Sequence, residues 1–174
     1  MEKLEKKNGM EKLMLETLME QQREYFASGA TLPVKVRMEA LSRLEMALQK
    51  QEQILCKALH TDLGKSKTES VMCEIGLVQG EIRWMKQHLG RLCRPKHVRT
   101  PLAQFAAKSY QSPSPYGNVL IMSPWNYPVL LTLEPLVDAI AAGNTAVVKP
   151  SAYAPASANV LKDLLEECFP PEYV

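Results

Sequence analysis

Two short apolar runs near the end of the chain, each followed by a turn and a helical pattern, constrain the fold most strongly. The runs are "GNVLIM" (117–122) and "TAVVKP" (145–150), which have the composition of buried strands. Between them, "VLLTLEPLVDAIAAGN" (129–144) has a helical pattern that ends at Gly143, a helix-stop signal. A further helix is predicted from about Pro155. Strands separated by such helices pair in parallel, so we predict an α/β fold with the first two βα units of a doubly wound sheet.

The part of the chain before these strands is predicted to be helical almost throughout. Apolar residues recur at helical spacing over residues 10–28, from Pro33 to about residue 60, and over 69–93. The segment "TDLGKSKTES" (61–70) is predicted as a loop, and Thr68 to Ser70 could cap the helix that follows. In the first helix the apolar residues fall on one broad face: Leu13, Leu15, Leu18, Met19, Tyr25 and Phe26.

Residues 97–116 form a short, turn-rich connection between the helices and the strands. Pro113 and Pro115 exclude a central strand there but allow an edge strand or one arm of a hairpin. We therefore divide the chain into a helical part (1–96), this connection, and the start of a Rossmann-like domain (117–174).

Composition excludes several classes of protein. A chain of 174 residues that is 46% hydrophobic and 23% charged is ordinary for a globular domain and argues against disorder. A net charge of +2 gives no reason to expect a nucleic-acid or membrane partner. No apolar run approaches the ~18 residues of a membrane-spanning helix, and the charged N-terminus lacks a signal-peptide core, so we expect a cytoplasmic protein. The cysteines are too widely spaced to predict a metal site or a disulfide framework.

The segment "SPWNYP" (123–128) follows the first predicted strand, and "KPSAYAP" (149–155) follows the second. Ligands of open α/β sheets bind at the carboxyl ends of the strands, which is where both segments fall. Asn126 could be there for its turn-forming backbone or for an amide that stabilises a developing oxyanion. Trp125 could form the wall of a flat ligand site, and the ammonium of Lys149 could reach a ribose or a phosphate. Each residue alone is also compatible with a purely structural role.

The order and spacing of these residues resemble those of a known family. "PWNYPVLLTLEPLVDAIAAGNTAVVKPSA" (124–152) is similar to the aldehyde dehydrogenase superfamily, most of all to its class 3 branch. The shared motifs are P-W-N-[FY]-P, a helix that ends in A-x-x-A-G-N, and V-V-K-P-S. The preceding helices and residues 97–116 resemble that family more loosely, so the resemblance covers most of the chain but only the N-terminal part of the family's fold.

The resemblance implies an NAD- or NADP-dependent oxidation of an aldehyde to a carboxylic acid, through a thiohemiacetal on a cysteine and a water activated by a glutamate. It implies that the Asn126 amide stabilises the oxyanion and that residues 97–116 form part of an oligomerisation ribbon in a homodimer. The residues it assigns to cofactor binding are Ser123, Pro124, Trp125, Lys149 and Ser151.

Three features of the family lie outside the similarity. The nucleophilic cysteine, the general-base glutamate of L-E-L-G-G, and the Gly-rich turn that faces the pyrophosphate all belong to segments that these residues do not contain. Cys168 lies in a helical pattern without the nucleophile's context, so we interpret it as a buried helix cysteine. The acid that normally follows K-P-S is replaced by Ala152, which removes a charge-assisted hydrogen bond to the ribose worth roughly 1.5–3 kcal/mol. The choice between NAD and NADP therefore stays open.

We accordingly expect an incomplete aldehyde dehydrogenase fold that is inactive alone. A second hypothesis is a short, non-catalytic relative that acts as a dimerisation or interaction module. A plain helical bundle would account for the first ninety-five residues, but it leaves "SPWNYP" and "VVKPS" without an explanation.

Overall fold

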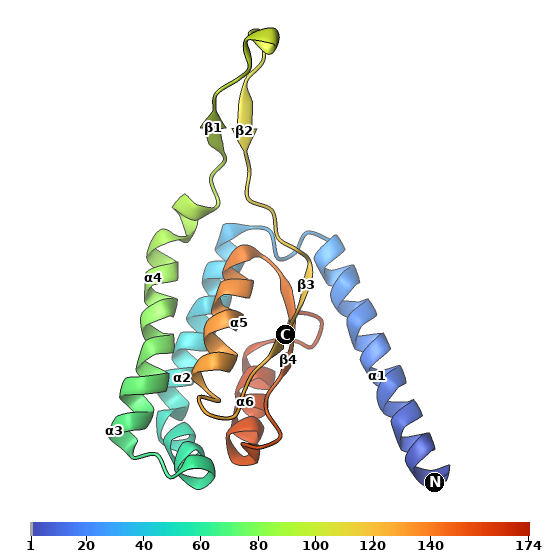
Figure 1. Cartoon of the computed structure of the whole chain (residues 1–174), viewed down its shortest axis with the longest axis vertical. Coiled ribbons are helices and arrows are strands. Elements are labelled where there is room, and N and C mark those ends of the chain that lie inside the picture. Colours follow the sequence, from blue (N-terminus) through green and yellow to red (C-terminus); the bar gives the residue numbers. More distant parts are fainter. Residues whose placement is uncertain (1) are drawn as a thin grey trace.

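The computed structural model describes the backbone from residue 2 to residue 174 and the side chains from residue 12 onward. Figure 1 shows a body of helices packed on a small sheet, with a long arm projecting from one end. The helical elements are α1 (Glu2–Ala27), α2 (Val34–Leu63), α3 (Lys67–Ser70), the π-helical turn η1 (Val71–Ile75), α4 (Gly76–Leu92), the 3₁₀ turn η2 (Leu102–Gln104), α5 (Leu130–Ala142) and α6 (Pro155–Cys168). The strands are β1 (Lys96–Val98), β2 (Ser109–Gln111), β3 (Asn118–Met122) and β4 (Thr145–Lys149).

Strands β3 and β4 pair in parallel, from Asn118 opposite Thr145 to Met122 opposite Lys149. This confirms the two βα units predicted from the sequence. The helix between the strands ends as expected, because Gly143 adopts a left-handed conformation (φ +93°) and its N–H bonds to the carbonyls of α5.

The hydrophobic core lies between one face of this sheet and the helices. Helix α5 packs on the strands, and α2 contacts α4, α5 and α6. Ile121 and Ala146 point into this core, whereas Leu120 and Met122 on the opposite face of β3 are exposed. The largest fully buried core side chains include Leu41, Leu44, Leu48, Leu55, Leu59, Ile75, Ile82, Leu89, Leu133, Leu136 and Ile140.

The arm in Figure 1 is the antiparallel hairpin β1–β2. Its side chains are mostly exposed, and His97 and Tyr110 stack edge to face across it, with ring centroids 5.4 Å apart. Strand β2 ends before Pro113 and Pro115, which agrees with the prediction that these prolines do not lie in a central strand. The division of the chain into three domains stays a prediction.

The connection between α2 and α4 differs from the predicted loop at 61–70. Helix α2 continues to Leu63, and Gly64 ends it in a left-handed conformation, so only residues 64–66 are non-helical. The cap of the next helix is Ser66, whose Oγ accepts a hydrogen bond from the Glu69 N–H at 3.1 Å; Thr68 to Ser70 lie inside the helix. Thr61 Oγ1 donates to the Lys57 carbonyl one turn earlier in α2, and the Asp62 carboxylate accepts from N–H groups of α6, so neither side chain forms a turn.

The apolar face predicted for the first helix is only partly buried. Leu13 and Leu15 are 63% and 48% exposed, because this half of α1 extends past the edge of the sheet. Contact with the sheet begins further along the helix, where the amide of Gln22 donates to the carbonyls of Ala146 (3.0 Å) and Pro171 (3.1 Å). In the residues that the structure describes, no helix is both long and apolar enough to cross a membrane.

Candidate functional site

The segments that follow β3 and β4 meet at one edge of the sheet. Met122 lies opposite Lys149 at the ends of the strands, and the Ser123 N–H donates to the Lys149 carbonyl at 3.3 Å. The parallel register therefore brings the loop 123–128 beside the segment 149–151, as their positions after successive strands predicted.

Buried hydroxyl groups fasten the loop to the first turn of α5. Thr132 Oγ1 donates to the Pro128 carbonyl at 2.5 Å and lies 2.6 Å from Ser123 Oγ. Since the Thr132 proton is used on the carbonyl, Ser123 donates to Thr132. Ser123 is buried, and this bond turns its side chain inward, so only its backbone can line a cofactor cleft.

The middle of the loop faces outward. Pro124 and Asn126 are exposed, and the Trp125 side chain is 53% exposed. The Asn126 backbone carbonyl accepts a hydrogen bond from Lys65 Nζ at 2.9 Å. Within the described part of the chain, the Asn126 side-chain amide makes no hydrogen bond, so it is available to a ligand at this edge.

Lys65 and Glu74, which the sequence analysis did not single out, lie directly beneath the loop. Lys65 Nζ is 2.6 Å from Glu74 Oε1, and the two side chains are 8% and 0% exposed. Glu74 Oε2 accepts from the backbone N–H groups of Val129 (2.8 Å) and Leu130 (3.1 Å) at the start of α5. One signal could have revealed this pair, because Glu74 interrupts the apolar stripe of its helix.

The second segment presents Lys149 to solvent. Its Nζ makes one weak contact, 3.4 Å from the Pro150 carbonyl, so the ammonium is free to contact an anionic ligand. Ser151 Oγ accepts from the Tyr153 N–H at 3.2 Å and shapes the turn before α6. Ala152 is exposed, with no acid in its place.

The N-terminus of α6 is already occupied by a carboxylate. Asp62 Oδ1 and Oδ2 accept from the N–H groups of Ala156 (3.1 Å) and Ser157 (2.7 Å). Asp62 therefore caps α6 from the end of α2, and it takes donors that a phosphate could otherwise have used.

Cys168 lies at the far end of α6 from this edge. The helix spans Pro155–Cys168, about 20 Å at its usual rise. The residue is buried, and burial raises the pKa of its thiol to about 11. A neutral, buried thiol is a poor nucleophile, which agrees with its interpretation as a structural helix cysteine. Across the described residues, no group of three or more His, Cys, Asp or Glu side chains is placed to hold a metal ion.

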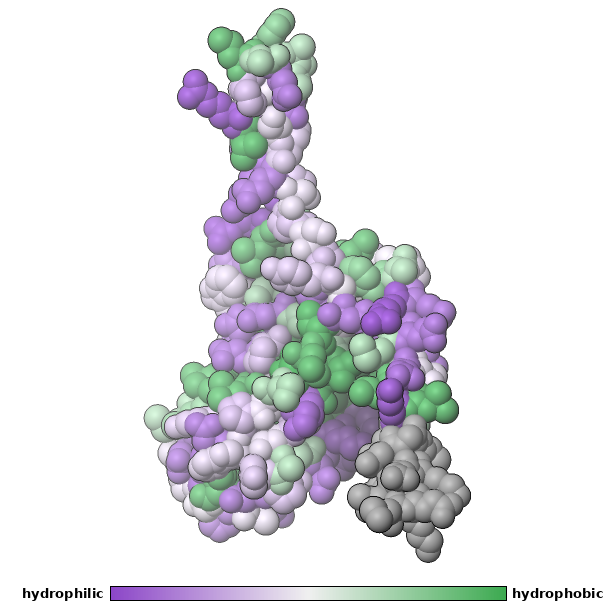
Figure 2. Space-filling view, turned by 45° about the vertical axis from the view of Figure 1, so that its right-hand side comes forward, coloured by the Kyte–Doolittle hydropathy of each residue, from purple (hydrophilic) through white to green (hydrophobic). Residues whose placement is uncertain are grey.

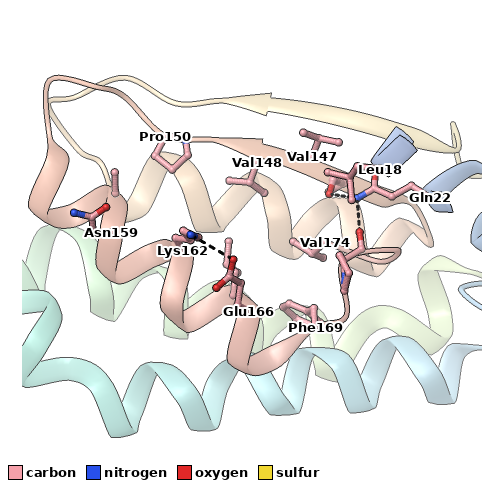
Figure 3. Close-up of a pocket in the computed structure, with 14 residues that line it drawn as sticks. Leu18, Gln22, Val147, Val148, Pro150, Asn159, Lys162, Glu166, Phe169 and Val174 are labelled. Carbon is pink, nitrogen blue, oxygen red and sulfur yellow. Dashed lines mark hydrogen bonds and ion pairs between the residues drawn. The ribbon is translucent and has the colours of Figure 1, made fainter. Parts of the chain in front are cut away.

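A groove of about 670 Å³ runs along the free edge of β4, between this strand and α6 (Figure 3). Its walls are largely apolar, with Val147 and Val148 on one side and Phe169 at one end. Gln22 closes one end of the groove, and the Ala146 N–H donates to the Tyr173 carbonyl at 3.0 Å there. Neither Asn126 nor Trp125 lines it, so the groove is separate from the candidate site.

A parallel βαβ unit with an amide-bearing loop and a lysine at its carboxyl edge defines an α/β protein with a candidate site at that edge. Residues 5–174 match the aldehyde dehydrogenase family, and the chain belongs to that family. It is 43% identical over 150 residues to 4,4'-diaponeurosporen-aldehyde dehydrogenase of Staphylococcus aureus, covering 86% of this chain and 33% of that protein. Aldehyde dehydrogenase family 3 member A2 of Rattus norvegicus is 37% identical over 153 residues, covering 88% of this chain and 32% of the relative.

The fold is also shared with solved structures. The substrate-bound state of Staphylococcus aureus AldH superimposes with a TM-score of 0.89 at 41% identity, covering 91% of this chain and 35% of that one. The chain thus spans about a third of the length of the relatives it matches.

Proposed function

We propose that the chain supplies the first part of the cofactor domain of an NAD- or NADP-dependent aldehyde dehydrogenase. The observation that carries this proposal is Asn126: its carbonyl accepts a hydrogen bond from Lys65, and its exposed amide lies in the loop that follows β3, at the edge where β4 ends in Lys149. An amide carried by a backbone held in this way can donate to the negative oxygen that forms when a nucleophile adds to an aldehyde carbonyl.

The side chains at this edge fit a flat, anionic cofactor. Lys149 offers an unengaged ammonium for a ribose or a phosphate, and the half-exposed Trp125 indole offers an apolar wall. The backbone of Ser123 and Pro124 and the turn at Ser151 complete the proposed contacts. When bound, the cofactor would accept the hydride that leaves the substrate, while these residues hold and orient it.

The test joins residues 1–174 to the remaining two-thirds of the Staphylococcus aureus relative and follows reduction of NAD and NADP with an aldehyde. Asn126→Ala should lower kcat by about 10²–10³, because one oxyanion donor is lost. Asn159→Ala, an exposed asparagine on α6, is the matched control and should leave kcat unchanged. An active fusion in which both variants turn over equally would refute the assignment of Asn126. We also propose that the 174-residue chain shows no turnover alone, and activity above background would contradict this.

The hairpin arm supports a second, compatible proposal, that the chain forms a homodimer through it. Leu102 and Phe105 at its far end are 88% and 84% exposed, and Figure 2 shows apolar side chains gathered there. Sedimentation should show a dimer that Phe105→Lys dissociates, whereas Lys108→Ala on the same arm should leave it intact. A protein that is monomeric at all concentrations, or a dimer unaffected by Phe105→Lys, would contradict this proposal.

A further inference from the structure

The ion pair of Lys65 and Glu74 is buried, and the loss of solvation on burial can exceed the attraction between the two charges. Charges removed from water lose several kcal/mol of solvation each, and a buried pair is often no more stable than apolar residues of the same shape. With 8% and 0% of the two side chains exposed, the pair has almost no contact with solvent. The other contacts of the two residues therefore indicate what the pair does.

Beyond the pair itself, the hydrogen bonds that the structure shows for these two charged groups reach residues 126–130. Lys65 Nζ donates to the Asn126 carbonyl at 2.9 Å and lies 3.9 Å from the centre of the Tyr127 ring. Glu74 binds the N–H groups of Val129 and Leu130 through its second oxygen. Lys65 thus holds the middle of the loop, Glu74 holds its end, and the 2.6 Å ion pair couples the two.

The local structure around the pair is specialised to present it. Gly64, with φ +68°, ends α2 so that Lys65 turns beneath the loop, and Ser66 starts the next helix immediately. Glu74 lies in the π-helical turn η1, which widens the helix at this point. The turn needs Gly76, because a Cβ there would lie 2.7 Å from the Val71 carbonyl oxygen. Such turns are frequent at functional sites.

We propose that Lys65 and Glu74 are positioning residues, which fix the backbone of Asn126 and thereby aim its side-chain amide at the carboxyl edge of the sheet. Holding the Asn126 carbonyl fixes the plane of the following peptide, and it thereby restrains the backbone from which the Asn126 side chain projects. Oxyanion donors act through preorganisation, so a loop that wanders would lose the benefit of the amide. The role of the amide as an oxyanion donor rests on the proposed function. The positioning of the loop by Lys65 and Glu74 does not.

The test measures the order of the loop in the 174-residue protein and needs neither aldehyde nor cofactor. In a Trp84→Phe background, Trp125 is the remaining tryptophan and reports on the loop by fluorescence. The side-chain amide of Asn126 is followed by ¹H–¹⁵N NMR. Lys65→Met should shift Trp125 emission to longer wavelength and move the Asn126 amide signals toward their positions in urea. Lys65→Arg, which keeps a cation, should restore much of both signals.

The control is Lys86→Met, which removes a partly exposed lysine ion pair, Lys86–Glu45 at 2.9 Å, that joins α4 to α2. It should leave the Trp125 and Asn126 signals unchanged. If Lys65→Met does not fold, Tyr127→Leu removes the ring contact of Lys65 and should move both signals in the same direction by a smaller amount. The proposal is wrong if both signals are unchanged in a folded Lys65→Met protein, or in Tyr127→Leu where Lys65→Met does not fold. It is also wrong if Lys86→Met moves the two signals by the same amount as Lys65→Met. Such a result would leave the proposed function standing, whereas an inactive fusion enzyme would leave the positioning result standing.

Discussion

Replacing Glu74 by glutamine removes one charge from the buried pair and nearly preserves its shape. Glu74 is 0% exposed, and one oxygen contacts Lys65 while the other accepts from the N–H groups of Val129 and Leu130. An amide has a single acceptor oxygen, so Glu74→Gln leaves either the ammonium or the two N–H groups facing an NH₂ group. Removal of one partner from a buried pair costs roughly 3–5 kcal/mol. For a chain of this size, that predicts a fall in Tm of roughly 6–20 °C.

The assay is urea unfolding followed by circular dichroism, with Glu45→Gln as the matched control. Glu45 pairs with Lys86 at 2.9 Å, but its side chain and that of Lys86 are 16% and 27% exposed, so its loss should cost about 1 kcal/mol or less. The double variant Lys65→Met/Glu74→Leu should cost less than the sum of its single variants, because neither charge is then left alone. Equal losses for Glu74→Gln and Glu45→Gln, at unchanged m-value, would refute the argument that burial sets the cost.

Three further predictions test the core, a turn and a thiol. Gly143→Ala should destabilise the chain by roughly 1–3 kcal/mol, because φ is +93° and the new Cβ would lie 2.9 Å from Arg37 Cζ. Gly90→Ala, where a Cβ on α4 would meet open space, should instead stabilise the chain by about 0.5–1 kcal/mol. Urea unfolding compares the two variants. Leu44→Ala, at a fully buried site, should cost about 2–5 kcal/mol in the same assay. Burial raises the pKa of the Cys168 thiol to about 11, so its alkylation by iodoacetamide should be slow at pH 8 and should accelerate as the pH rises toward 11. Urea-unfolded protein should react readily at pH 8. Fast modification of the folded protein at pH 8 would contradict the buried placement.

Local patterns were sufficient to predict the two βα units. The apolar runs at β3 and β4 are uninterrupted, and the helix between them ends at Gly143, whose left-handed conformation is the ordinary use of glycine at that position. The position of Asn126 after the first strand and of Lys149 at the end of the second also followed from order alone, because parallel strands end at the same edge.

Long-range side-chain contacts explain what the sequence did not predict. Asp62 lies within the segment 61–70 that the sequence predicts as a loop, yet it belongs to α2 and its carboxylate caps α6, far along the chain. Lys65 was assigned to the same loop, and its partners Glu74 and Asn126 belong to segments that the fold brings together. Propensity and periodicity describe neighbours in sequence, so they cannot show which distant group a polar side chain will meet.

Asp62 and Glu74 together change how an anionic ligand can be held at this edge. Each carboxylate comes from the helical N-terminal part and accepts from the first N–H groups of the helix that follows a strand, Glu74 at α5 and Asp62 at α6. A helix N-terminus is the usual phosphate site of a doubly wound sheet, and here both are neutralised by the protein itself. The absence of a G-x-G-x-x-G turn after β3 has the same physical meaning, since no phosphate needs to approach that backbone closely. Under the proposed function, we therefore expect an anionic cofactor at this edge to be held by an exposed cation, and Lys149, at the end of β4 with its ammonium in solvent, could supply it.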